Sequence, residues 1–335
     1  MRNAMKQYLA LALSSVMMGI IGSTLAADGV EEQSYTRPAM PAPKDNQLTP
    51  DRIELGKHLF FDPRLSGSNW ISCATCHNPT LGWSDGLPTA IGHGMKVLGR
   101  ATPTILNTGY QRFQFWDGRV KTLEEQALEP IIAGDEMAGN LDDIIKKLAV
   151  IKGYQDMFEK AYPGEGLSKV TMAKALASFE RSIVATEAPF DRFYKGDQKA
   201  ISDSAKKGFE LFKGKANCAA CHQNHNFSDD GFHNVGLKGN QDVGRFAKVP
   251  INVLKGAFKT PTLRDIALTA PYMHNGIYKT LDEVVDHYDR GGDGEVNDPN
   301  MTKLNLTPEE KKHIVAFLQS LTGVPLEVTF PHLPQ

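Results

Sequence analysis

This chain of 335 residues has no cysteine outside two short motifs and no excess of basic charge. It also has no long apolar run beyond its N-terminal segment. The formal net charge of −2 at pH 7 gives no support for binding nucleic acid or an anionic membrane surface. Beyond the N-terminal segment, no apolar run approaches the length of a membrane-spanning helix, so we expect a chain that does not span a membrane. Alternating runs of β-branched residues are also few, which favours a mainly α fold.

The N-terminal segment is the one part with a strongly apolar run. The apolar stretch from Leu9 to Ile21 follows a positively charged start, and Thr24-Leu25-Ala26 supplies small residues for cleavage before Ala27. This order is typical of a secretory signal peptide covering residues 1–26, and a permanent N-terminal anchor is the alternative. A protein exported in this way would work in the periplasm.

All four cysteines fall into two Cys-x-x-Cys-His strings, Cys73 to His77 and Cys218 to His222. An exported protein would more often use four cysteines for two disulfides. A thioredoxin-like pair would not require the adjacent histidine, and a zinc site would gather four ligands around one metal. The strings are instead the attachment signature of c-type haem, in which two thiols bind the porphyrin and the histidine ligates the iron. The predicted attachment residues are Cys73, Cys76, Cys218 and Cys221, and the predicted proximal ligands are His77 and His222.

A similar order of elements occurs twice along the chain. Gly56 to Phe60 precedes the first string, and Gly208 to Phe212 precedes the second. Each half closes on an apolar helical pattern, at Met172 to Phe179 and at Ile314 to Leu318. This repetition predicts two c-type cytochrome-like haem domains in tandem.

Domain boundaries follow from composition. Residues 27–47 are rich in proline and charge and are expected to form an extended lead-in, and a helical pattern begins near Thr49-Pro50. We expect an N-terminal domain over residues 48–190 and a C-terminal domain over residues 191–335, with the linker near Glu187 to Lys195.

Three further strings make the sequence similar to a known family. Phe60 to Ser66, Phe115 to Arg119 and Leu268 to Tyr272 resemble segments of the bacterial di-haem cytochrome c peroxidases and their methylamine-utilisation (MauG) relatives. The likeness covers residues 48 to 323. It implies that the N-terminal haem reacts with hydrogen peroxide, that the C-terminal haem handles electrons from a small donor such as a cytochrome c or a cupredoxin, and that the protein forms a homodimer.

The resemblance also implies residues for the peroxide site. His93, between two glycines, matches a removable distal ligand of the first haem, and an exposed loop histidine is the alternative. Glu136 matches the distal acid that would move a proton between the two oxygens of peroxide. Gln126 and Pro130 match residues that line the same pocket.

Two features would lie between the haems. Trp116 resembles the tryptophan that relays electrons between the haems in this family, and a packed core aromatic with a purely structural role is the alternative. The family binds calcium through carbonyls of a Thr-x-Pro sequence, here Thr269 and Pro271, together with an asparagine that is replaced here by Ala101. Calcium is therefore expected only if waters complete the coordination.

The sixth ligand of the second haem separates the candidate functions. The peroxidases use methionine where this chain has Tyr288, whereas MauG-type proteins have tyrosine there; Met301 and Met273 are rival ligands. The first hypothesis is a periplasmic peroxidase that reduces hydrogen peroxide to water, which His93 favours. The alternative is a peroxide-dependent oxidase that modifies side chains of a partner protein, which Tyr288 favours. A plain electron carrier is a third class, but it would need neither Glu136 nor Trp116.

Overall fold

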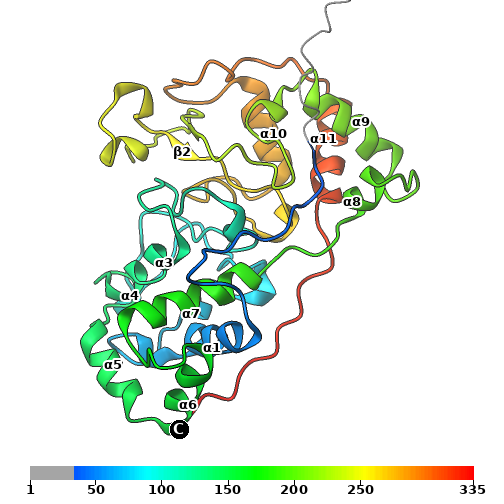
Figure 1. Cartoon of the computed structure of the whole chain (residues 1–335). Helices are drawn as coiled ribbons and strands as arrows, with labels where there is room; N and C mark the ends of the chain where they lie inside the picture. Colours follow the sequence, from blue (N-terminus) through cyan, green and yellow to red (C-terminus); the bar gives the residue numbers. More distant parts are fainter. Residues whose placement is uncertain (1–33) are drawn as a thin grey trace, which may run out of the picture. The chain divides into compact units, whose positions relative to one another are not determined.

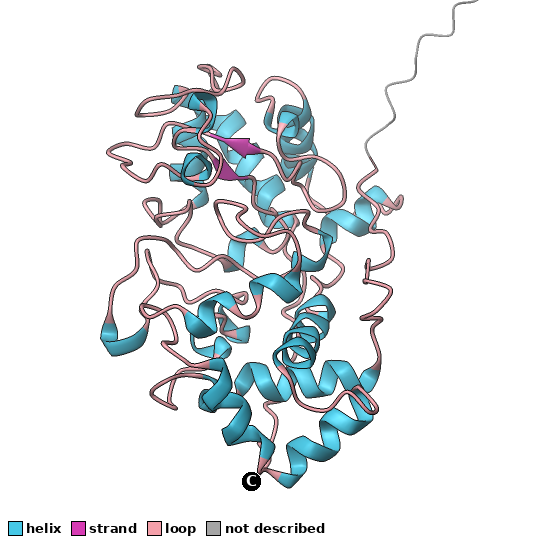
Figure 2. Cartoon of the chain, turned by 60° about the vertical axis from the view of Figure 1, so that its left-hand side comes forward, coloured by secondary structure: helices cyan, strands magenta, loops and turns pink. Residues whose placement is uncertain are grey.

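The structure, a computed structural model, describes residues 34–335 (Figure 1). The predicted signal peptide, residues 1–26, and the start of the lead-in lie outside the described residues. The fold is mainly α, as predicted, with one two-stranded sheet in the described part of the chain (Figure 2). No helix among these residues is long and apolar enough to cross a membrane.

The elements alternate with long irregular segments. In chain order the α-helices are α1 (Pro50–Phe61), α2 (Cys73–Cys76), α3 (Leu123–Gln126), α4 (Glu129–Ile132), α5 (Leu141–Ala149), α6 (Lys152–Ala161), α7 (Lys169–Ser182), α8 (Pro189–Tyr194), α9 (Asp203–Lys213), α10 (Leu281–Arg290) and α11 (Pro308–Ser320). Strands β1 (Phe232–His233) and β2 (Phe258–Lys259) pair antiparallel, with Phe232 opposite Lys259. Short 3-10 turns are η1 (Pro63–Leu65), η2 (Pro79–Leu81), η3 (His93–Met95), η4 (Thr108–Tyr110), η5 (Cys218–Ala220), η6 (Arg245–Ala247), η7 (Asn252–Leu254) and η8 (Ile266–Leu268).

The first half is built on the crossing of α1 and α7. Thr49 caps α1 and Pro50 occupies its first turn, so the helix begins where the sequence predicted. The two backbones approach closely at Gly56, where an added Cβ would lie 1.9 Å from the carbonyl oxygen of Ala175. Only glycine fits this crossing. Around it lies a buried apolar cluster that includes Phe60 and Phe179.

The second half repeats this crossing with α9 and α11. At Gly208 an added Cβ would lie 1.9 Å from the carbonyl oxygen of His313. The buried rings of Phe212 and Phe317 pack against each other in the same half, with their centroids 4.9 Å apart. The equivalent glycines and aromatics confirm the predicted tandem arrangement of two cytochrome-like units.

The terminal segments of the described chain cross between the halves. Tyr35 is buried in the second cluster, where its ring stacks on Phe227 at 4.9 Å. The segment after α11, red in Figure 1, returns to the first half, where Phe330 contacts Phe61 and the Pro334 carbonyl accepts a hydrogen bond from Arg64. The domain boundaries at 48–190 and 191–335 therefore stay predictions, because each core also uses residues from outside its own range.

Two candidate haem sites and the wall between them

The first Cys-x-x-Cys-His string forms the short helix α2 and the residue that ends it. Ser72 caps the helix, and His77 follows Cys76 with its Nδ1–H donating to the Trp83 carbonyl oxygen at 3.2 Å. This bond leaves Nε2 as the ring nitrogen available to iron, which is the usual arrangement of a ligating histidine. Cys73, Cys76 and His77 line a cavity of about 740 Å³, which we call cavity 1.

The second string has the same local design. The turn η5 carries Cys218, and the Nδ1–H of His222 donates to the Phe227 carbonyl oxygen at 2.8 Å. Cys218, Cys221 and His222 line a smaller cavity of about 190 Å³, which we call cavity 2. Both strings thus present two thiols and one oriented imidazole to a cavity.

These donor sets fit covalently attached haem. No disulfide joins any of the four cysteines, all of which lie in the described chain. Burial lowers the pKa of His77 and of His222, which favours the neutral form that binds metal. Burial also raises the pKa of the Cys76 thiol to about 11, so this sulfur is not a ready thiolate for exchange with other disulfides. The predicted haem attachment is consistent with this chemistry.

The predicted distal residues converge on cavity 1. Gln126 at the end of α3, Pro130 in α4 and Glu136 in the loop that follows all line it. Burial raises the pKa of Glu136, the nearby carboxylates Glu129 and Asp135 raise it further, and Arg119 opposes them. A carboxyl of raised pKa holds a proton more readily than one in water, which suits a group that accepts and returns a proton.

Arg119 is a cavity residue to which the sequence analysis gave no role. It lines cavity 1, lies 3.4 Å above the Phe115 ring and donates to Glu129 Oε2 at 2.6 Å. It therefore brings positive charge to the wall that holds Glu136. Its place at the end of the Phe115 to Arg119 string was the available signal.

His93 lies at the edge of this site. Its backbone N–H donates to the Glu136 carbonyl oxygen at 2.8 Å, and an added Cβ at Gly92 would lie 2.0 Å from the Asp135 carbonyl oxygen. The His93 loop is thus fixed to the Glu136 loop. Among residues 34–335, Gly92 belongs to the lining of cavity 1 but His93 does not, and the buried Nδ1 of His93 has no hydrogen-bond partner.

Trp116 stands in the wall shared by the two cavities. Its Nε1–H donates to the Ala101 carbonyl oxygen at 2.9 Å, and its own carbonyl accepts from the Lys259 backbone N–H at 2.8 Å. The first bond anchors the indole and the second anchors the backbone that carries it. Met273 also lines both of them.

Lys259 is a second residue that the sequence analysis did not identify. Its side chain is buried in β2, lines both cavities and donates from Nζ to Gln111 Oε1 at 3.0 Å. Burial lowers its pKa to about 8, against the opposing effect of Asp230 and Asp229. The sequence around Lys259 contains no motif that predicts a site residue, because only the tertiary structure places this lysine beside Trp116.

The residues expected near calcium also reach cavity 1. Ala101, Thr269 and Pro271 all line it. The Thr269 hydroxyl donates to the Ile266 carbonyl oxygen at 3.2 Å, and the Ala101 carbonyl is already used by Trp116.

Tyr288 and Met301 both line cavity 2. Tyr288 lies on α10, with the Cys218 and Cys221 sulfurs among its electrostatic neighbours, and burial raises the pKa of its phenol. Its neighbour His287 is fully buried and bonds the Val235 carbonyl oxygen through Nε2 at 2.9 Å. This anchor fixes the rotation of α10 and hence the side that faces the cavity.

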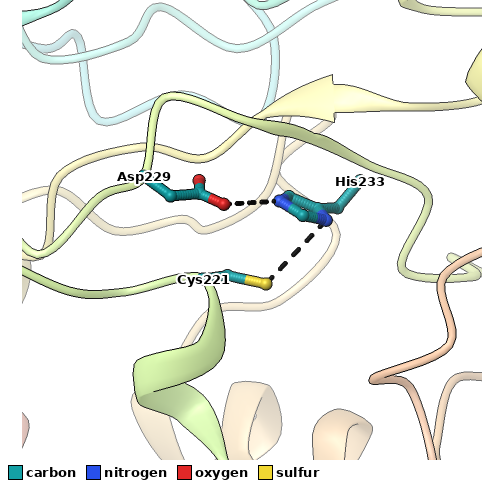
Figure 3. A group of neighbouring side chains, drawn as sticks. All are labelled: Cys221, Asp229 and His233. Atoms are coloured by element: carbon teal, nitrogen blue, oxygen red, sulfur yellow. Dashed lines mark hydrogen bonds and ion pairs between the residues drawn. The ribbon is translucent and has the colours of Figure 1, made fainter. Parts of the chain in front are cut away.

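A cluster of polar side chains adjoins the second string (Figure 3). The imidazole of His233 lies between Asp229 and Cys221. Its Nε2 is hydrogen-bonded to the Asp229 carboxylate at 3.0 Å, and its Nδ1 is hydrogen-bonded to the Asp298 carboxylate and contacts the Cys221 sulfur. The donor atoms of Cys221, Asp229 and His233 lie within 4.8 Å of one another, a spacing that would also suit a metal ion. Because both ring nitrogens are already bonded to carboxylates, the cluster is satisfied as an ion-pair network that joins Asp298, in the loop of Met301, to the haem string.

Comparisons with known proteins agree with this geometry. Residues 50–199 match the family model for di-haem cytochrome c peroxidase, and residues 205–322 match the one for cytochrome c. The methylamine utilization protein MauG of Methylorubrum extorquens is 47% identical over 307 residues, covering 90% of this chain and 86% of the relative. The cytochrome c551 peroxidase of Pseudomonas aeruginosa is 36% identical over 342 residues, covering 97% of this chain and 95% of the relative.

A solved structure, described as a MauG-like protein associated with microbial copper homeostasis, superposes with a TM-score of 0.81 at 29% identity, covering 88% of this chain and 95% of that one. The family resemblance predicted from the sequence is thereby confirmed. This chain belongs to the family of di-haem cytochrome c peroxidases and MauG proteins, and it is an oxidoreductase of the c-type haem class.

Proposed function

We propose that this protein is a periplasmic, MauG-like oxidase that uses hydrogen peroxide to remove electrons from side chains of a partner protein. The observation that carries this proposal is the position of Tyr288, whose half-buried side chain lies in the wall of cavity 2. A tyrosinate ligand stabilises oxidised iron, whereas methionine favours the reduced state. The position of His93 outside the lining of cavity 1 also supports it.

The side chains around cavity 1 would manage the protons of the reaction. Haem supplies the redox chemistry and the iron at which peroxide binds. Glu136 would accept a proton from one oxygen of peroxide and return it to the other, which would leave as water. Arg119 restrains the pKa of Glu136, while Gln126 and Pro130 shape the wall beside it.

Trp116 connects the two sites in this proposal. Trp116 lines both cavities, its indole N–H donates to the Ala101 carbonyl oxygen and its backbone carbonyl accepts from the Lys259 N–H, so it offers an anchored aromatic step for electrons between them. The second string, which ends at His222, would therefore be the place where electrons are exchanged with the partner while peroxide reacts at the first string.

A cytochrome c peroxidase is the second candidate, because Met301 lines cavity 2 together with Tyr288. In that case a small cytochrome c or cupredoxin would donate two electrons singly, and hydrogen peroxide would be reduced to water. Met301 and His222 would then both be residues that hold the second haem, and His93 would be a residue that holds the first.

Peroxide consumption by the fully oxidised protein separates the two candidates. The MauG-like proposal predicts that peroxide reacts at once with the diferric protein, because no side chain has to leave the first iron. A protein that reacts only after one-electron reduction would contradict it and support the peroxidase. A His93→Ala variant is the matched control, since it should abolish any requirement for prior reduction.

Calcium and dimer formation remain predictions. Thr269 and Pro271 line cavity 1 together with Ala101, which replaces the asparagine ligand, so calcium held by the Thr269 and Pro271 carbonyls would need waters to complete its oxygen ligands. Calorimetric titration of the chelated protein with calcium, and sedimentation of the holoprotein, measure the two properties directly.

A further inference from the structure

Glu180 is a carboxyl group in cavity 1 to which neither candidate function assigns a role. It lies on α7 between Phe179, whose ring packs on Phe60 at 5.1 Å, and Arg181. Arg181 is committed to another partner, because its guanidinium donates to both oxygens of Glu124 at 2.6 and 2.8 Å. Glu180 is left without that cation.

The Glu180 carboxyl is enclosed and faces the cavity. The residue is 6% exposed, it lines cavity 1, and its Oε2 has no hydrogen-bond partner among residues 34–335. An ionised carboxylate in such a place would be desolvated and unpaired, which is costly. Burial accordingly raises the pKa of Glu180 to about 8 despite Arg181, and Glu124 raises it further. The group therefore carries its proton at neutral pH.

Peroxide chemistry in this cavity needs such a proton. Conversion of one hydrogen peroxide to two waters consumes two electrons, supplied by the partner or donor protein, and two protons. Glu136 passes a proton from one oxygen to the other and adds none to the balance. Another acid must bring protons to the cavity.

We propose that Glu180 is a second acid of cavity 1, which gives its carboxyl proton to an oxygen that leaves as water and regains a proton from solvent. The charged and titratable groups that interact electrostatically with it are Cys73 on α2, Glu124 on α3 and Arg181 on its own helix. This inference rests on the proposed peroxide chemistry and applies equally to the oxidase and to the peroxidase.

The test compares the wild-type holoprotein with Glu180→Gln and Glu136→Gln. Infrared spectra should show the carbonyl band of a protonated carboxyl at pH 7 that disappears as the pH passes about 8 and is missing in Glu180→Gln. Glu180→Gln should lower kcat for peroxide on the order of 10²-fold with little change in KM. The wild-type decline of kcat above about pH 8 should also be lost, and haem content per chain should stay the same.

The outcomes separate this inference from the proposed function. Full turnover in Glu180→Gln together with loss of turnover in Glu136→Gln would overturn the role of Glu180 and leave the proposed function standing. Lack of peroxide turnover in the wild type would overturn the proposed function itself. If Glu180→Gln fails to retain haem, the wild-type infrared titration still decides, since absence of a protonated carboxyl at pH 7 would overturn the proposal.

Discussion

Burial sets the proton chemistry of individual side chains around cavity 1. It raises the pKa of Glu136 and Glu180, and it lowers the pKa of Lys259 to about 8. In each case the enclosed environment disfavours the charged form. Glu180 and Lys259 can therefore exchange protons near pH 8, and Glu136 holds its proton more tightly than a carboxyl in water, beside the site where peroxide is proposed to react.

Glu136→Gln tests the proton shuttle at this scale. The amide keeps the size of the side chain but cannot accept and return a proton, so we expect kcat for peroxide to fall by about 10²- to 10⁴-fold. Stopped-flow measurement of peroxide consumption, with haem content determined in parallel, provides the check. Glu159→Gln, on the exposed face of α6, is the matched control and should keep wild-type turnover.

Sequence motifs identified the site residues that belong to recognisable strings, and missed those defined by packing. The two haem strings, Trp116 and Glu136 could be named in advance. Glu180 could have been suspected, because it lies four residues after Leu176 and so shares the buried face of its helix. Its lack of a partner depends on Arg181 pairing with Glu124 across the fold, which no local pattern reveals.

The helix crossings are the main structural elements that hold the haem strings. α1 packs on α7, and α9 packs on α11, at glycines whose backbones touch the facing carbonyl oxygens. Their positions were visible in the sequence as Gly56 to Phe60 and Gly208 to Phe212. The reason for glycine was not visible, because it depends on the facing helix. An added Cβ would lie only 1.9 Å from the carbonyl oxygen of Ala175 or of His313.

Substitution of either glycine should therefore destabilise its own half. Gly56→Ala and Gly208→Ala force the crossing helices apart, and we expect each to lower the free energy of unfolding by about 1–3 kcal/mol. Urea unfolding followed by circular dichroism measures the change. Gly99→Ala is the control, since an added Cβ there meets nothing within 4 Å. Equal stability of all three variants would show that the crossings are not close-packed.

On the scale of the whole molecule, the two halves are connected by more than the linker. The final segment of the chain returns from α11 to the first half, where Leu326 and Val328 pack against the first core and Pro334 contacts Arg64. Composition could not predict this return, because the segment has no periodic pattern. Tyr35 makes the opposite crossing into the second core.

Removal of residues 325–335 tests this connection. The loss of the partly buried Leu326 and Val328 should destabilise the first half by roughly 2 kcal/mol. Hydrogen exchange measured by mass spectrometry should become faster in α1 and α6 and stay unchanged in α9. Glu327→Gln, at an exposed position of the same segment, should change neither. Equal acceleration in both halves would contradict the assignment of the segment to the first core.

The two haem strings have unequal surroundings, and this difference carries the proposed function. Cavity 1 has about 740 Å³ and two carboxyl groups of raised pKa, whereas cavity 2 is smaller and holds Tyr288 and Met301. This difference supports the proposal that peroxide reacts at the first string and that the second exchanges electrons. Whether Tyr288 or Met301 would hold the second haem together with His222 decides between the oxidase and the peroxidase.

Electron paramagnetic resonance of the ferric holoprotein tests this assignment most directly, with Tyr288→Phe and Met301→Leu measured beside the wild type. The oxidase proposal predicts that Tyr288→Phe changes the signal of the haem held by His222, because the phenolate ligand is lost, and that Met301→Leu leaves this signal unaltered. A signal that changes in Met301→Leu but not in Tyr288→Phe, or in neither variant, would contradict the proposal.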